Sequence, residues 1–153
     1  MDISTIEREV YVEARPETVF AVVSEPDHVR LWWPDAAEYE PTPGAVGRIG
    51  FRKDDDALSW ESFTVVESVP PRRFSFRWTL PVDEVAEASN SFLVVFELEP
   101  DGTGTRVRLT ETGFTERVWD QATAEASYAD HVHGWTYFLG RLAAYAETMQ
   151  VPA

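Results

Sequence analysis

Five consecutive segments of this sequence alternate apolar and polar residues, and this alternation restricts the fold more than any other feature. Side chains along a strand point in turn to the two faces of a sheet, so each segment has one apolar face to bury. A glycine-rich turn joins the last two segments, and Gly102 and Gly104 are expected to supply its positive φ angles. The segments predict an antiparallel meander; they read "GRIGFRK", "SWESFTVVESV", "RRFSFRWTL", "SFLVVFELEP" and "TRVRLTETGF".

The residues before this meander predict one more strand and two short helices. Alternation from Ile6 to Ala14 indicates the strand. Pro16 opens the apolar stretch "PETVFAVVSE", and proline is well suited to the first turn of a helix. A second short helix is expected from about Pro26, closed off by Pro34, and "AAEYEP" after it is a weaker strand.

The end of the chain predicts one long helix, which Asp120 can cap and which runs from about Gln121 to Met149. Its apolar residues fall within about 60° of one direction, with Trp135 at the centre. A single helix can cover a meander of about six strands only if the sheet curls around it, so the fold class is α+β. The residues of this face are Tyr128, His131, Val132, Trp135, Phe138, Leu139, Leu142, Ala146 and Met149.

Gly134 stands beside Trp135 in the middle of this helix, where a glycine costs about 1 kcal/mol relative to alanine. It lies about 100° around the helix from the indole. Two explanations fit. The favoured one is that a strand approaches closely at the glycine; the other is that the missing side chain leaves volume beside the indole for a ligand.

Length and charge limit the range of functions. A chain of 153 residues has the size of one domain, so we expect a single domain over residues 1–153. The net charge of −14 argues against nucleic acid and anionic membranes as partners, because both would repel the protein. There is no cysteine and no pattern of a secretory signal, which favours a cytoplasmic protein. The oligomeric state is not determined, and a homodimer is compatible with the sequence.

The sequence offers no recognisable metal or cofactor site, and we expect neither. His131 and His133 are two residues apart on a helix, so they diverge by about 200° and cannot share a metal ion. No HExxH pattern and no cysteine set is present. A GxSxG nucleophile motif is also absent, and His133 is expected to face solvent.

Three residues are candidates for acid–base chemistry, although none is assigned as catalytic. Strand alternation places Glu61 and Glu67 on the apolar face of "SWESFTVVESV", and Glu111 on that of "TRVRLTETGF". If these faces line a cavity, Glu61 or Glu111 is a desolvated acid suited to proton transfer. His131 is the third candidate, because it lies on the apolar face of the long helix. Alternatively, the carboxylates are wet strand ends and His131 is a satisfied histidine at the domain edge.

Aromatic residues are the most informative part of the composition, which includes six Trp, five Tyr and nine Phe. Rings from the strands face rings from the long helix, and they either interdigitate or enclose a hollow. Trp32 and Trp33 are not expected to be buried together on one face, so one of them is a candidate lid. The candidate ligand-binding residues are Trp32, Phe63, Phe76, Trp78, Phe92, Phe96, His131, Trp135, Phe138 and Leu139.

Five segments, in this order and spacing, resemble a known group of proteins. They are "IEREVYVEARPETVFAVVSEPDHVRLWWP", "PTPGAVGRIGF", "VVESVPPRRFSFRWTL", "FELEPDGTGTRVRLTETGF" and "HGWTYFLGRLAAY". Together they resemble the SRPBCC superfamily (START/Bet v1-like), in the branch related to the C-terminal domain of the Hsp90 ATPase activator Aha1. The resemblance implies a helix-grip fold, in which a seven-stranded sheet wraps around a C-terminal helix.

The resemblance also implies binding of a small apolar molecule between sheet and helix, since members of the superfamily bind lipids, hormones or polyketides there. Some members are cyclases or hydrolases. The co-chaperone function of the eukaryotic members relies on an additional N-terminal domain. The resemblance covers only the other domain, so we do not expect direct activation of an Hsp90-type chaperone. Three hypotheses follow: a ligand-binding module, an enzyme of cyclase, hydratase or hydrolase type, and a protein-interaction module with a filled core.

Overall fold

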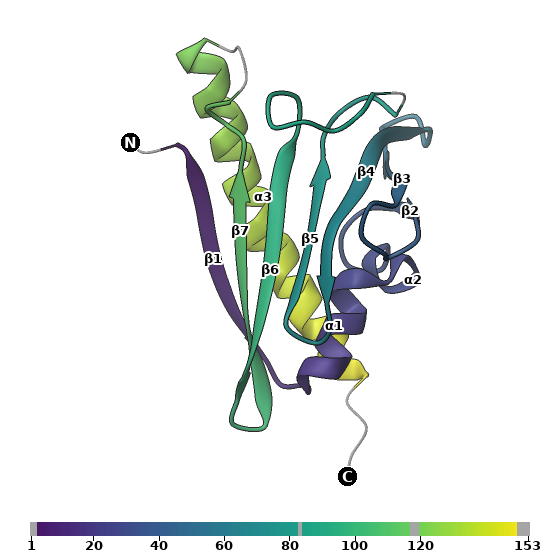
Figure 1. Cartoon of the computed structure of the whole chain (residues 1–153), viewed down its shortest axis with the longest axis vertical. Helices are drawn as coiled ribbons and strands as arrows, with labels where there is room; N and C mark the ends of the chain where they lie inside the picture. Colours follow the sequence, from purple (N-terminus) through teal and green to yellow (C-terminus); the bar gives the residue numbers. More distant parts are fainter. Residues whose placement is uncertain (1–2, 83, 117–119, 150–153) are drawn as a thin grey trace.

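Seven antiparallel strands form one curved sheet around a long helix, as the sequence predicts (Figure 1). The computed structural model describes residues 3–82, 84–116 and 120–149. The strands lie in the order β1-β7-β6-β5-β4-β3-β2. The elements are β1 (Thr5–Val12), α1 (Pro16–Ser24), α2 (Pro26–Val29), β2 (Ala36–Glu38), β3 (Val46–Arg52), β4 (Leu58–Val69), β5 (Arg73–Trp78), β6 (Phe92–Asp101), β7 (Gly104–Thr112) and α3 (Gln121–Thr148).

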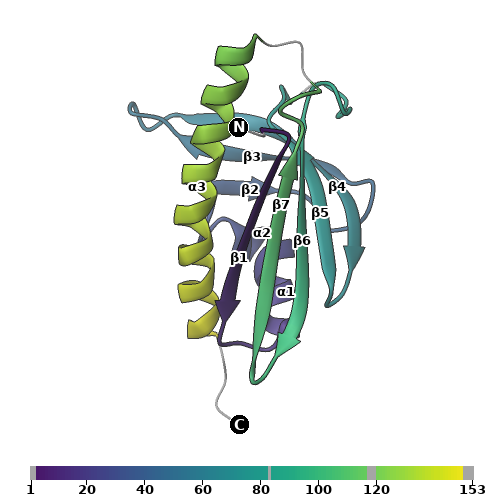
Figure 2. The ribbon, with the colours of Figure 1, turned by 90° about the vertical axis from the view of Figure 1, so that its left-hand side faces the viewer.

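The sheet curls strongly enough for one helix to cover it. In Figure 2, β2 and β3 run crosswise to β1 and β7. Helix α3 lies along the side of the sheet toward which these strands curve. The Asp120 side chain accepts a hydrogen bond of 2.7 Å from the backbone N–H of Thr123, which fixes the first turn of α3. The α+β helix-grip architecture follows from this arrangement.

Two local predictions about the strands are wrong. Gly102 has a positive φ of 59°, but Gly104 does not; a Cβ at Gly104 would instead collide with the Val12 carbonyl oxygen and with Tyr11 on β1. A bulge in β4 then shifts the register between Val65 and Glu67. Glu67 therefore pairs with Ser75 on the outer face, where the Arg73 guanidinium donates a 3.0 Å hydrogen bond to it.

The core lies between the concave face of the sheet and the helices. Its sheet side is built from buried apolar residues of β1 and of β3 to β7, and its helix side includes Trp135, Leu139 and Leu142 of α3. α1 packs between β5, β6 and the C-terminal half of α3. Within the described residues, no helix is both long and apolar enough to cross a membrane.

Tyr39, just after β2, links the edge of the sheet to α1. Its ring stacks on Phe63 with centroids 4.3 Å apart, and its hydroxyl donates a 2.8 Å hydrogen bond to the Ser24 carbonyl oxygen. Burial raises the pKa of the Tyr39 hydroxyl far above its ordinary value, and the nearby Glu25 carboxylate adds to this effect.

This shift predicts a loss of stability in alkaline solution. Because the folded-state pKa of Tyr39 is raised, its stabilising effect is complete below the unfolded value of about 10 and falls as the pH rises above it. Tyr39→Phe should lower the free energy of unfolding by about 0.5–1.5 kcal/mol at pH 7, through the lost hydrogen bond, and the difference from wild type should shrink above pH 10. Urea unfolding at several pH values measures this. Tyr137→Phe, at an exposed tyrosine, is the control; a constant difference across the pH range would contradict the assignment.

Candidate ligand cavity and its buried glutamate

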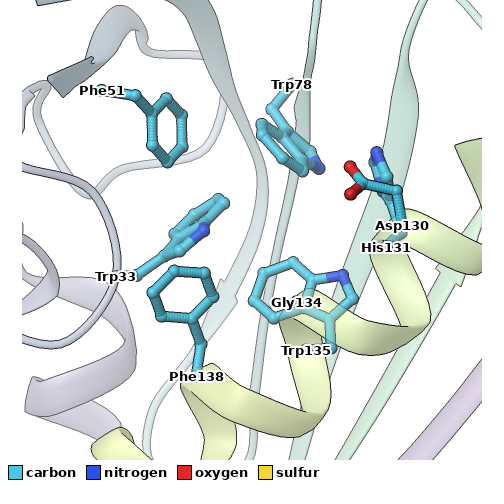
Figure 3. A pocket seen from close by; sticks show the side chains of 8 residues that line it. All are labelled: Trp33, Phe51, Trp78, Asp130, His131, Gly134, Trp135 and Phe138. Carbon is cyan, nitrogen blue, oxygen red and sulfur yellow. The ribbon is translucent and has the colours of Figure 1, made fainter. Parts of the chain in front are cut away.

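A cavity of about 180 Å³ lies between α3 and the sheet (Figure 3). Five aromatic rings form most of its wall, and an acidic, a basic and a glycine residue complete it. Phe51 and Phe138 are half-buried and Asp130 is exposed, so the cavity opens to solvent on this side. The wall residues are Trp33, Phe51, Trp78, Asp130, His131, Gly134, Trp135 and Phe138.

Each wall residue is positioned by an element that was predictable, but the elements come from distant parts of the chain. α3 supplies five of the eight residues, from Asp130 to Phe138, at spacings that place them on one side of the helix. β3 supplies Phe51 and the last residue of β5 is Trp78. Trp33 follows α2. The curl of the sheet is what brings β3 and β5 to the same stretch of α3.

Trp33 is at the centre of the aromatic wall. Its ring centroid is 4.9 Å from that of Trp78, 5.0 Å from that of Trp135 and 6.1 Å from that of Phe51. The Trp33–Trp78 and Trp33–Phe51 pairs are edge-to-face, the arrangement that the charge distribution of aromatic rings favours. These contacts hold the rings in place around the hollow, so the wall does not depend on a ligand for its shape.

Glu111 of β7 lies behind this wall and is completely buried, with 0% of its surface exposed. Three ring nitrogens surround its carboxyl group. Trp78 Nε1 donates to Oε2 at 2.8 Å, and Trp135 Nε1 donates to Oε1 at 2.9 Å. His131 Nδ1 lies 2.7 Å from Oε1. Since an indole can only donate, both carboxyl oxygens act as acceptors.

Burying a carboxyl group is costly unless its oxygens are hydrogen-bonded. The neighbours of Glu111 across the sheet are apolar, Ile6 on β1 and Val94 on β6, so the ring nitrogens are its polar environment. The same bonds fix the orientation of Trp78, Trp135 and His131, which are three of the wall residues. Glu111 thus holds the cavity wall without itself lining the cavity.

The candidate residues from the sequence divide into two groups. Trp78, His131, Trp135 and Phe138 lie on the cavity wall, and Glu111 contacts the first three of them. Glu61 is half-buried on β4 and does not line the cavity. The remaining candidates are buried in the core and do not line the cavity, although Phe76 and Phe92 contact the wall residues Trp33 and His131. These candidates are Trp32, Phe63, Phe76, Phe92, Phe96 and Leu139.

Trp32 and Trp33, which the sequence does not place together on one buried face, have different surroundings in the structure. Both are buried, in the turn that follows α2. Trp32 Nε1 donates to the Val22 carbonyl oxygen at 2.9 Å, within the core, and Trp33 reaches the cavity. The stacked pair, with centroids 6.1 Å apart, joins core and cavity.

Sequence reasoning also missed Phe51 and Asp130 as wall residues. Phe51 lies two residues after the buried Ile49 on β3, so the two share a face, and this pattern could have placed Phe51 on the inner side of the sheet. Asp130 precedes His131 on α3 but gave no signal, because an acidic residue at the border of an apolar face usually points to solvent. His133 is exposed, as predicted.

Gly134 borders the cavity, and no strand packs against it. A Cβ built on it would have no atom within 4 Å, so the favoured explanation from the sequence, close approach of a strand, is wrong. The second explanation agrees with the structure: the missing side chain leaves part of the hollow beside Trp135 unfilled.

Comparison with protein families matches residues 13–147 to the Activator of Hsp90 ATPase homolog 1-like protein family. The chain belongs to this family. The match covers all elements from α1 to nearly the end of α3, and it confirms the resemblance that the sequence segments suggested. No curated protein matches the sequence.

Solved structures of bacterial proteins share the fold. A protein from Nitrosomonas europaea superposes with a TM-score of 0.78 at 14% identity, over 98% of this chain and 99% of its own. A protein from Mesorhizobium loti gives 0.73 at 21% identity, over 96% and 99%. The Aha1 dimer from Colwellia psychrerythraea, a solution structure, gives 0.70 at 21% identity, over 94% and 96%. At these identities the likeness establishes the fold.

The role of Glu111 predicts a large effect of a nearly isosteric substitution. Glu111→Gln replaces one acceptor oxygen with an NH₂ group, so at least one buried indole N–H of Trp78 or Trp135 loses its partner. The free energy of unfolding should fall by about 1–3 kcal/mol, measured by urea denaturation. Glu9→Gln, at an exposed carboxylate 3.3 Å from Arg108, is the matched control and should change it by less than about 0.5 kcal/mol. Equal changes in the free energy of unfolding for the two substitutions would show that the hydrogen bonds of Glu111 do not stabilise the fold.

Proposed function

We propose that this protein binds a small apolar or aromatic ligand in the cavity between α3 and the sheet. The observation that carries the proposal is an aromatic-lined hollow kept open by a glycine in the middle of a helix. An alanine at position 134 would meet no neighbouring atom and would favour the helix by about 1 kcal/mol, but its methyl group would reduce the open volume beside Trp135. A protein-interaction module, in contrast, needs no such hollow.

The size of the cavity limits the ligand. Pockets for drug-sized molecules have volumes of roughly 300–1,000 Å³. About 180 Å³ suits a single small group, either a whole small molecule or one end of a longer one that leaves through the mouth beside Phe51 and Phe138. The ring faces supply apolar contact area, and the positioned rings reduce the entropy that binding must overcome.

Two glycines on α3 offer a matched test of this proposal. Gly134→Ala and Gly140→Ala should each raise the free energy of unfolding by up to about 1 kcal/mol, because a Cβ at either position meets no atom. Only position 134 borders the cavity. Indole, used as a neutral probe and followed through the NMR signals of the tryptophan Nε1–H groups, should bind more weakly to Gly134→Ala and unchanged to Gly140→Ala. Absence of indole binding to the wild type, together with no small molecule co-purifying in native mass spectrometry, would remove the ligand-binding proposal.

The contact between His131 and Glu111 favours acid–base catalysis as a second candidate function. A carboxyl group on Nδ1 orients an imidazole and leaves Nε2 for a substrate, as in catalytic triads. Among the described residues His131 Nε2 has no hydrogen-bond partner, and the ring lies on the cavity wall with 11% of its side chain exposed. Glu111 would be the positioning residue and His131 the group that takes a proton.

A small aromatic carbon acid can test this candidate. In 5-nitrobenzisoxazole a base removes the proton on C3, the N–O bond breaks, and a coloured cyanophenolate forms. The wild type should accelerate this reaction at least about tenfold over His131→Phe, since a positioned base typically contributes 10²–10⁴. His133→Phe, at the exposed histidine two residues away, should keep the full rate. Equal rates for wild type and His131→Phe would exclude His131 as the base.

A further inference from the structure

We infer that the cavity selects ligands that carry a small organic cation, an alkylated ammonium group of about the size of trimethylammonium. This inference rests on the proposed ligand-binding function and specifies its ligand class. The argument uses the ring faces of the wall, the hydrogen bonds behind them and the distribution of charge around the mouth.

The wall has the composition of an aromatic cage. Three tryptophans and two phenylalanines surround the hollow in Figure 3, and the faces of such rings carry partial negative charge. Cages of this kind bind quaternary ammonium groups, with tryptophan the best partner for a cation. An alkylated ammonium also suits the apolar lining, because its methyl groups bury without needing hydrogen-bond acceptors.

Glu111 should strengthen this preference. The indole N–H groups of Trp78 and Trp135 both donate to its carboxyl oxygens, at 2.8 and 2.9 Å. Hydrogen bonds in a dry interior polarise the groups that form them, so electron density shifts toward the two indole rings. The cavity-facing rings of both tryptophans are therefore better partners for a cation than unbonded indoles would be.

The mouth of the cavity carries a negative charge. Asp130 places its carboxylate at the cavity, on the side where Trp78 lies (Figure 3), and no ion pair to another described residue neutralises it. The wall contains no arginine or lysine, and its basic residue, His131, directs Nδ1 to Glu111. The net charge of −14 attracts cations to the protein and repels anions.

Three probes of nearly the same shape separate charge from apolar contact. Choline carries a trimethylammonium group, 3,3-dimethylbutan-1-ol replaces the nitrogen with carbon, and 3,3-dimethylbutanoate carries a negative charge beside the same tert-butyl group. Titrations of the full chain, followed by tryptophan Nε1–H signals, give the three affinities. Choline should bind at least about fivefold more tightly than the alcohol, and the anion should bind most weakly.

Two variants assign the selectivity to its sources. Asp130→Asn removes the carboxylate and should lower the affinity for choline about two- to fivefold, while the affinity for the alcohol stays the same. High salt should reduce the difference in choline affinity between wild type and variant. Phe51→Leu keeps an apolar side chain without a ring face and should weaken choline about threefold more than it weakens the alcohol. Glu125→Gln, at an exposed acid on α3 outside the cavity, is the charge-matched control and should leave all affinities unchanged.

The outcomes separate this inference from the function on which it rests. Equal affinities for choline and the alcohol, or tighter binding of the anion, would overturn cation selection and leave an apolar cavity. Binding of indole without binding of choline would do the same. If neither indole nor any of the three probes binds, the inference fails, and the ligand-binding proposal fails with it when no small molecule co-purifies either.

Discussion

The burial of one carboxyl group organises this structure. Glu111 is completely removed from water, and its oxygens are satisfied by ring nitrogens from β5 and α3. These bonds connect the sheet to the helix at the level of the cavity, and they add directional constraints to the packing of the rings. Because an unsatisfied buried acceptor is costly, the three rings are confined to one arrangement. The wall of the cavity is a consequence of that arrangement.

Curvature of the sheet creates the space that these rings enclose. β3 runs crosswise to β1 and β7, so Phe51 faces α3 across a gap that a flatter sheet would leave outside the molecule. Trp33 enters from the turn after α2 and contacts rings from both layers. Helix α3 then lacks a side chain at Gly134, where one would extend into the hollow. The rings of the wall therefore pack closely against one another, and the space that they enclose is left unfilled.

The combination of aromatic faces with negative charge distinguishes this cavity from a purely apolar one. A hollow lined only by aliphatic side chains would discriminate ligands by shape and volume. Ring faces add an electrostatic preference that operates without desolvating a charged protein group inside the cavity. The exposed Asp130 adds a longer-range attraction at the mouth, which depends on ionic strength. Family membership fixes the fold, and these features belong to the particular residues of this chain.

The sequence by itself determined the fold class and most of the elements, because strand and helix periodicity are local properties. Val107 and Leu109 already placed Glu111 on the inner face of its strand, and helical spacing placed Trp135 at the centre of the buried face of α3. Tertiary structure alone decided which distant rings meet at that carboxyl group. It also decided that Trp32 joins the core while Trp33 lines the cavity. A bulge moved Glu67 to the outer face, and the curl of the sheet left Gly134 beside a hollow. Such outcomes depend on contacts between segments far apart in the chain, which no local pattern records.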